Sequence, residues 1–287
     1  MKIKDIYARE VLDSRGFPTL KTTVVLEGGF TGVASVPSGA STGSHEALEL
    51  RDNDKGRFLG KGVLKAKKNV EKLKKHLAGR NFKNILDIDK ELLKSDGTAN
   101  KTSYGANAIL GISMAVLCAG ANSKKLPLYK YLRQVYGIKE KQYILPVPML
   151  NIINGGKHAD SGLNVQEFMI VPCFAKTFKS ALRAASETYH ILKALLSGRK
   201  LSTSVGDEGG FAPKLEKHEE ALKILVNAAQ KAGYPKMQIA LDAASSEFFE
   251  NGFYYFEGKK LDYKQMTQVY KNWVKKYPLI SLEDPLQ

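Results

Sequence analysis

Acidic residues at the ends of apolar segments are the first feature of this sequence that could do chemistry. The segments Ile239–Asp242 and Leu279–Glu283 each end in a carboxylate, and Val205–Glu208 does so between glycines. A fourth acid, Glu167, lies near the start of the apolar segment 165–171. Carboxylates that face one another in one pocket repel, so a hard divalent cation such as Mg²⁺ or a proton must neutralise them. A cation would make the pocket a metal centre, and a proton would make one carboxyl a general acid.

The same acids could instead be ordinary helix caps, because Asp is favoured at the position where a helix begins after a strand. Against this, glycines flank the acid pair Asp207–Glu208 on both sides, in SVGDEGGFAP (204–213). Glycine costs backbone entropy on folding, so this loop should gain something in return. Close approach of backbone and substrate to the Glu208 carboxyl would be such a gain. The recurrence of the pattern at several strand ends favours a site over caps.

The elements that would position these acids lie in the C-terminal half, 143–287. Strands and helices alternate there, and near-continuous apolar strands between helices predict a parallel sheet covered by helices. In a (β/α)₈ barrel the carboxyl ends of the strands meet on one face, where the acids would come together. The predicted strands are 165–171, 201–205, 238–242 and 279–283, the helices are 178–196, 216–232 and 263–276, and an Asn-Gly hairpin is predicted at 249–255.

The N-terminal part, 1–135, predicts a separate α+β domain. Its first 60 residues alternate strands and turns, and Pro37–Gly43 is a run of small or turn-forming residues. Helices are predicted at 61–80, 88–95 and 104–121. The last of these is rich in Ala and Gly and nearly free of charge, which indicates a buried central helix. A proline-containing linker, 144–150, leads into the second domain.

The charge balance is unusual: 44 Lys and Arg against 29 Asp and Glu give a net charge of +15. Much of the excess lies in 61–80, whose apolar residues recur at helical spacing, so we expect an amphipathic helix with a basic, solvated outer face. A nucleic acid or another anionic surface is the alternative partner, although no nucleic-acid motif supports it.

No apolar run reaches the roughly 18–20 residues that span a bilayer, no signal peptide is visible, and Cys118 and Cys173 lie among apolar neighbours. We therefore expect a cytoplasmic protein with reduced thiols.

A long ordered set of motifs identifies the family that the sequence resembles. The motifs are Ala8–Thr19, Val36–Gly43, His45–Glu49, Asp96–Lys101, Gly105–Gly111, Asn154–Ala159, Gln166–Met169, Gly206–Gly210, Leu241–Glu247 and Ser281–Pro285. With these motifs the chain resembles enolase from Ile6 to Gln287. Enolase is the glycolytic lyase that interconverts 2-phosphoglycerate and phosphoenolpyruvate. The resemblance implies an α+β N-terminal domain that carries a mobile Ser41 loop, followed by a TIM-type barrel.

The resemblance implies a role for each candidate residue. Asp242 and Glu283 match two of the three carboxylates that hold a first Mg²⁺, and Ser41 matches the ligand of a second Mg²⁺ that arrives with substrate. Glu208 matches the general acid that helps to expel the C3 hydroxyl, with Glu167 as its partner.

Further implications concern the substrate and the assembly. His158 and Gln166 match substrate-contacting positions on neighbouring loops, and Ser41 contacts the substrate's metal; His158 could also be a plain loop histidine. The implied substrate is a small phosphorylated three-carbon acid, whose developing negative charge two Mg²⁺ ions stabilise. A homodimer is implied, as is a cytoplasmic location with an additional secreted or cell-surface population.

The match departs from the family in two ways. Residues 143–287 are too few for a complete barrel, which takes about 250 residues. In the family the third metal carboxylate, the lysine base and the phosphate-binding loop come later in the chain. We therefore expect a fragment with an incomplete barrel, inactive alone.

The basic charge is the second departure, and it leaves open a non-catalytic basic binding protein derived from enolase. Another acid-sugar lyase or isomerase of the same superfamily is a third possible function, against which the motifs around Ser41 and Glu208 argue.

Overall fold

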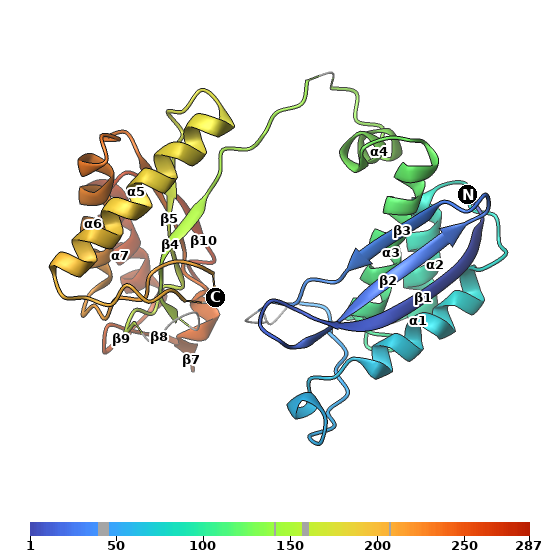
Figure 1. Cartoon of the computed structure of the whole chain (residues 1–287). Coiled ribbons are helices and arrows are strands. Elements are labelled where there is room, and N and C mark those ends of the chain that lie inside the picture. Colours follow the sequence, from blue (N-terminus) through green and yellow to red (C-terminus); the bar gives the residue numbers. More distant parts are fainter. Residues whose placement is uncertain (40–45, 141, 157–160, 207) are drawn as a thin grey trace. The chain divides into compact units, whose positions relative to one another are not determined.

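The structure is a computed structural model that describes residues 1–39, 46–140, 142–156, 161–206 and 208–287. The chain divides into two units, Met1–Gln142 and Tyr143–Gln287 (Figure 1). Each unit has its own sheets, helices and buried apolar cluster.

A three-stranded antiparallel sheet forms one layer of the first unit. β1 (Ile3–Leu12) pairs with β2 (Pro18–Leu26), which pairs in turn with β3 (Thr31–Ser35). The helices of this unit are α1 (Leu64–Leu77), α2 (Ile85–Asp96), α3 (Ala106–Ser123) and α4 (Leu128–Val135), with a short 3₁₀ turn, η1 (Phe58–Gly60). The predicted helices match α1 to α3, whereas α4 was not predicted.

α3 is the central helix of the first unit, as its small residues indicate. It contacts β2, β3, α1 and α2. A Cβ built on Gly32 of β3 would lie 2.1 Å from the carbonyl oxygen of Ala115 and from the amide nitrogen of Ala119, so helix and strand backbones touch here. Among the described residues, α3 is also the one helix long and apolar enough to cross a membrane, a property that buried core helices share.

The basic helix α1 has the predicted two faces. Val70, Leu73 and Leu77 are fully buried in the first unit's core. Lys68 and Lys75 are exposed on the outer side, so the positive charge of this helix lies on a solvated face.

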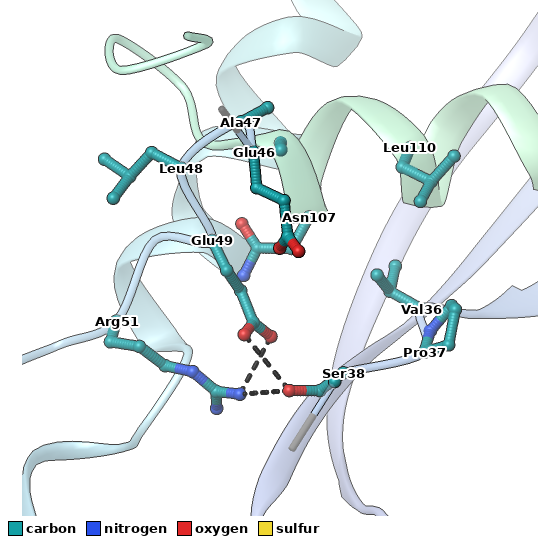
Figure 2. A pocket seen from close by; sticks show the side chains of 12 residues that line it. Val36, Pro37, Ser38, Glu46, Ala47, Leu48, Glu49, Arg51, Asn107 and Leu110 are labelled. Atoms are coloured by element: carbon teal, nitrogen blue, oxygen red, sulfur yellow. Dashed lines mark hydrogen bonds and ion pairs between the residues drawn. The ribbon is translucent and has the colours of Figure 1, made fainter. Parts of the chain in front are cut away.

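The chain beyond β3 lines a cavity of about 530 Å³ together with the segment 46–51 and the start of α3 (Figure 2). Arg51 Nη2 donates to Ser38 Oγ (3.0 Å) and to Glu49 Oε1 (2.8 Å), and Ser38 Oγ donates to Glu49 Oε2 (3.1 Å). Arg15 Nη2 donates to the carbonyl oxygens of Ser38 and Gly39 (2.9 and 2.8 Å). These bonds fix the last described residues before the predicted Ser41 loop.

A four-stranded sheet in the order β10–β6–β5–β4 organises the second unit. Its strands are β4 (Leu150–Asn154), β5 (Glu167–Val171), β6 (Gln238–Asp242) and β10 (Leu279–Glu283). β6 and β10 are parallel, but β5 is antiparallel to both β4 and β6. The prediction of an all-parallel sheet is therefore wrong for β5. Two helices, α5 (Phe178–Gly198) and α6 (His218–Lys231), connect β5 to β6. A single crossover helix would make the two strands parallel, whereas this pair of helices leaves them antiparallel.

The remaining elements of the second unit mostly follow the sequence pattern. β7 (Phe249–Glu250), β8 (Phe253–Phe256) and β9 (Lys259–Leu261) form a small antiparallel sheet with the predicted Asn-Gly turn, after the 3₁₀ turn η3 (Ser245–Glu247). α7 (Tyr263–Lys276) begins at a capping box between Asp262 and Gln265. The predicted strand 201–205 is wrong, because Val205 makes an isolated bridge to Phe211 and is 58% exposed. Among the described strands the sheet does not close, which agrees with the predicted α+β domain followed by an incomplete TIM-type barrel.

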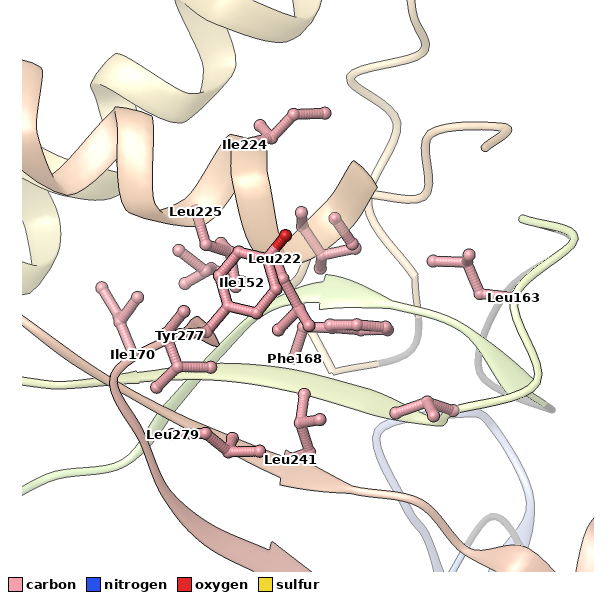
Figure 3. Packing of buried hydrophobic residues seen from close by; sticks show 14 of the residues in the cluster. Ile152, Leu163, Phe168, Ile170, Leu222, Ile224, Leu225, Leu241, Tyr277 and Leu279 are labelled. Carbon is pink, nitrogen blue, oxygen red and sulfur yellow. The ribbon is translucent and has the colours of Figure 1, made fainter. Parts of the chain in front are cut away.

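Helices and sheet of the second unit enclose one large apolar core (Figure 3). Phe168 and Ile170 of β5 pack in it with Leu222 and Leu225 of α6. Met169, between them in the sequence, belongs to a separate small cluster, as alternation along a strand requires. Side chains with the parity of Met169 therefore project from the sheet face opposite the helix-covered core.

Candidate active site

Four polar residues lie in one row across the sheet of the second unit. The strand registers pair Asn154 with Glu167, Glu167 with Asp242, and Asp242 with Glu283. Cross-strand partners project to the same face, and Glu167 has the parity of Met169, so the row lies on the face opposite the helix-covered core. Asn154, Asp242 and Glu283 are the last residues of β4, β6 and β10, which places the row at the carboxyl ends of these strands.

Other acidic side chains surround Glu167. Its half-buried position raises the pKa of its carboxyl from 4.5 to about 8, with further contributions from a hydrogen bond and charge repulsion with Glu208 and from the charges of Asp242 and Glu283. A carboxyl with such a pKa keeps its proton at neutral pH, so Glu167 can donate a hydrogen bond to Glu208.

Glu208 reaches this row from a loop, and not from the end of a strand as the sequence indicated. The Gly206 N–H donates to the Gly210 carbonyl (2.8 Å), which closes the loop. Phe211, the residue after Gly210, is hydrogen-bonded to β4 through both its N–H and its carbonyl group. The Phe211 N–H donates to Ile152 O (3.0 Å), and Phe211 O accepts from the Asn154 N–H (2.9 Å). A Cβ on Gly210 would lie 2.3 Å from Asn154 Oδ1, so the close approach of loop and strand requires glycine.

Two asparagines of β4, which the sequence analysis missed, border the acids. Asn151 Nδ2 donates to Asn154 Oδ1 (2.7 Å) and to Glu208 Oε2 (3.2 Å). Asn154 is fully buried, and its Nδ2 has no hydrogen-bond partner among the described residues. The available signal was the pair of asparagines inside an apolar strand, where this residue type is depleted.

Gln166 precedes the row and is bonded to β6. Its backbone N–H donates to Asp242 O (3.0 Å), and its side-chain Nε2 lies 3.5 Å from Asp242 Oδ2. The side chain is 95% buried, yet Gln166 Oε1 has no partner within the described part of the chain. A buried acceptor without a partner is costly, which makes this atom suited to a ligand's hydroxyl or to an ordered water.

Asp242 and Glu283 are the described residues best placed to hold a hard cation. They are neighbours on parallel strands and offer the oxygen ligands that Mg²⁺ prefers. A cation beside them would also offset the repulsion that both exert on the ionised form of Glu167. No group of three or more His, Cys, Asp or Glu in the described ranges is arranged to hold a metal ion, so the two carboxylates fit as part of a ligand set.

Two predicted site residues, Ser41 and His158, lie outside the described residues. The others, Glu167, Glu208, Gln166, Asp242 and Glu283, all belong to the second unit, where the registers and hydrogen bonds above bring them together.

Known families match both units of the chain. Residues 3–132 match "Enolase, N-terminal domain", and residues 142–287 match "Enolase, C-terminal TIM barrel domain". A curated protein named "Enolase" from Elusimicrobium minutum (strain Pei191) is 60% identical over 285 residues. That alignment covers 99% of this chain and 67% of the relative.

Proposed function

This chain belongs to the enolase family, and from that premise we propose that it takes part in the Mg²⁺-dependent, reversible dehydration of 2-phosphoglycerate to phosphoenolpyruvate in glycolysis. The observation that carries the proposal is the row of Glu167, Asp242 and Glu283, with Glu208 hydrogen-bonded to Glu167. This arrangement combines a carboxyl that retains its proton with carboxylates suited to a cation.

The acid pair would serve the departing hydroxyl. Glu208 acts as the general acid that gives a proton to the C3 hydroxyl, which then leaves as water. Glu167 keeps its proton near neutral pH because burial and the neighbouring acids raise its pKa to about 8. Its hydrogen bond to Glu208 lets it pass this proton to Glu208, which then gives it to the departing hydroxyl. Asn151, which donates to Glu208 Oε2, holds the carboxyl in this orientation.

The cation ligands of the proposal are Asp242 and Glu283 for one Mg²⁺ and Ser41 for a second. When bound, these ions would stabilise the negative charge that gathers on the substrate carboxylate after loss of the C2 proton. Gln166 and His158 are the proposed substrate contacts, and the buried, unpartnered Oε1 of Gln166 supports the first of them. A homodimer is proposed from the family relationship, with sedimentation velocity as its test.

Calorimetric titration of Mg²⁺ into the 287-residue chain tests the metal site. Asp242→Asn and Glu283→Gln should each weaken Mg²⁺ binding at least tenfold, because each removes one anionic ligand. Glu216→Gln, an exposed residue of the same unit, removes the same charge away from the site and should leave binding unchanged. Equal Mg²⁺ affinity in all four proteins would refute the assignment.

Turnover is tested by following phosphoenolpyruvate formation from 2-phosphoglycerate. Since the described residues offer two carboxylates and no group of three metal-binding side chains, we propose that this chain alone turns over far more slowly than an enolase with a full ligand set. Mg²⁺-dependent turnover at the ordinary rate of an enolase would contradict this part of the proposal while supporting the reaction itself.

A further inference from the structure

The orientation of the Asn154 amide follows from a chain of hydrogen bonds that begins at Glu208. The NH₂ group of Asn151 donates to Glu208 Oε2 at 3.2 Å. The same NH₂ group donates to Asn154 Oδ1 at 2.7 Å. A half-turn of the Asn154 amide would bring two NH₂ groups together. Its own Nδ2 therefore points away from Asn151.

Packing holds the Asn154 side chain in this position. The residue is fully buried, and Gly210 lies so close that a Cβ there would be 2.3 Å from Asn154 Oδ1. The backbone N–H of Asn154 is bonded to Phe211 O (2.9 Å). Both the backbone and the amide oxygen are thus fixed, which leaves Nδ2 as a preorganised donor. It finds no acceptor among the described residues, and a buried donor left unpaired destabilises the protein.

The position of this donor in the sheet relates it to the proposed site. Asn154 is the register partner of Glu167, on the strand at the other side of β5 from Asp242. Gln166 Oε1, close to Asp242, is a buried acceptor that also has no partner in the described part of the chain. An unpaired donor in the row and an unpaired acceptor beside Asp242 complement a ligand that carries both acceptor oxygens and a hydroxyl group.

We propose that Asn154 is an additional substrate-binding residue, whose Nδ2–H donates to an oxygen of the small hydroxy acid that occupies this row. The proposal rests on the function proposed above, of which it deepens the substrate recognition. It also gives Asn151 a second role, because this residue orients Glu208 and Asn154 at the same time. Removal of the Nδ2 donor should therefore weaken acid binding without removing either carboxylate of the proposed metal site.

The side-chain NH₂ signal of Asn154 in a nitrogen-15 NMR spectrum provides a direct test. The signal is assigned by its loss in Asn154→Asp, which keeps the size and the Oδ1 acceptor. Mg²⁺, D-glycerate and 2-phosphoglycerate are then added in turn to the full chain. We expect the signal to shift on addition of either acid. If neither acid shifts the signal, Nδ2 donates to a water molecule and not to the acid, and the proposal is overturned.

Calorimetry supplies the second measurement. Asn154→Asp and Asn154→Thr should each bind 2-phosphoglycerate at least tenfold more weakly than wild type, while Asn272→Asp, on the exposed face of α7, should bind it as wild type does. Fluorescence of the buried Trp273 checks that each variant folds. Wild-type affinity in both Asn154 variants would overturn the proposal.

The two proposals fail in different ways. An Asn154 signal that shifts with the acids, in a protein whose Mg²⁺ binding is indifferent to Asp242→Asn, contradicts the proposed metal site and retains Asn154. Mg²⁺ binding that depends on Asp242, with no shift at Asn154, contradicts the Asn154 proposal alone.

Discussion

The raised pKa of Glu167 predicts that the second unit loses stability as the pH rises. In the folded state this pKa is about 8, against 4.5 when the neighbours are absent. Below pH 4.5 the carboxyl is protonated in both states and has no effect. Between pH 4.5 and 8 the unfolded chain has released a proton that the folded chain retains. The free energy of unfolding therefore falls through this window, and the loss is complete above pH 8.

The size of the effect follows from the same pKa difference. One pKa unit corresponds to about 1.4 kcal/mol, so a rise from 4.5 to about 8 sets an upper limit of about 5 kcal/mol. Glu167 is only half-buried, and solvent screens its repulsion with the other acids, so we expect about 2 kcal/mol. Glu167→Gln is neutral at every pH and nearly isosteric. It should match wild type near pH 4.5 and exceed it by about 2 kcal/mol at pH 9.

Urea unfolding followed by tryptophan fluorescence measures this difference in stability for the second unit of the chain. The sequence has one tryptophan, Trp273, and it is buried in the second unit, so its emission reports that unit's unfolding. Glu216→Gln is the control, because it removes an exposed carboxylate from the same unit. A difference between Glu167→Gln and wild type that stays constant from pH 4.5 to 9 would show that Glu167 ionises normally, and would refute the electrostatic reasoning.

Three further substitutions test the packing. Gly210→Ala should destabilise the second unit by about 1–3 kcal/mol in urea unfolding, because the new methyl group collides with Asn154 Oδ1, whereas Gly198→Ala, with no atom within 4 Å of its Cβ, should be neutral or slightly stabilising. His218→Phe should cost about 1–3 kcal/mol, since the fully buried ring accepts two backbone N–H bonds at Nε2. Burial lowers the pKa of His218, so wild type should also lose stability below about pH 6.5 in a way that this variant does not. Gly32→Ala should lower the thermal midpoint of the first unit, measured by circular dichroism, because its Cβ has no room against α3.

Each of these substitutions has an outcome that contradicts it. Equal stability of the Gly210 and Gly198 variants would mean that the loop can move away from β4. An unchanged pH profile after His218→Phe would mean that the ring is not held in its neutral form. A wild-type melting curve for Gly32→Ala would mean that β3 and α3 are less tightly packed than the structure shows.

Local sequence pattern predicts the regular elements of the second unit well. The strands 238–242 and 279–283 and the helix 263–276 have the observed bounds, because apolar runs and a capping residue mark their ends. The segment 201–205, Leu-Ser-Thr-Ser-Val, misled the prediction, since its composition does not reveal that Val205 will be exposed. The direction of β5 depends on how two helices pack between it and β6, which is a tertiary property that periodicity does not contain.

The candidate site was also predicted only in part, where local sequence pattern determines it. Acids at strand ends are visible in the sequence, and the registers place Glu167, Asp242 and Glu283 in one row. Glu208 was expected at a strand end, but its loop depends on backbone bonds between Phe211 and β4. The two asparagines of β4 were not predicted as site residues: their place in an apolar strand was a signal, but their burial and amide orientation arise only when the loop meets the strand.

The row across the sheet also determines which insertions and deletions the second unit can tolerate. Its four members come from four strands that span Asn154 to Glu283, so each depends on its own strand's alignment with the next. Loss of one residue inside a strand would turn that strand's polar side chain to the apolar side and bring a core residue into the row. Length changes in the connecting helices and hairpin leave the alignment intact. Variation in length should therefore concentrate in these connections.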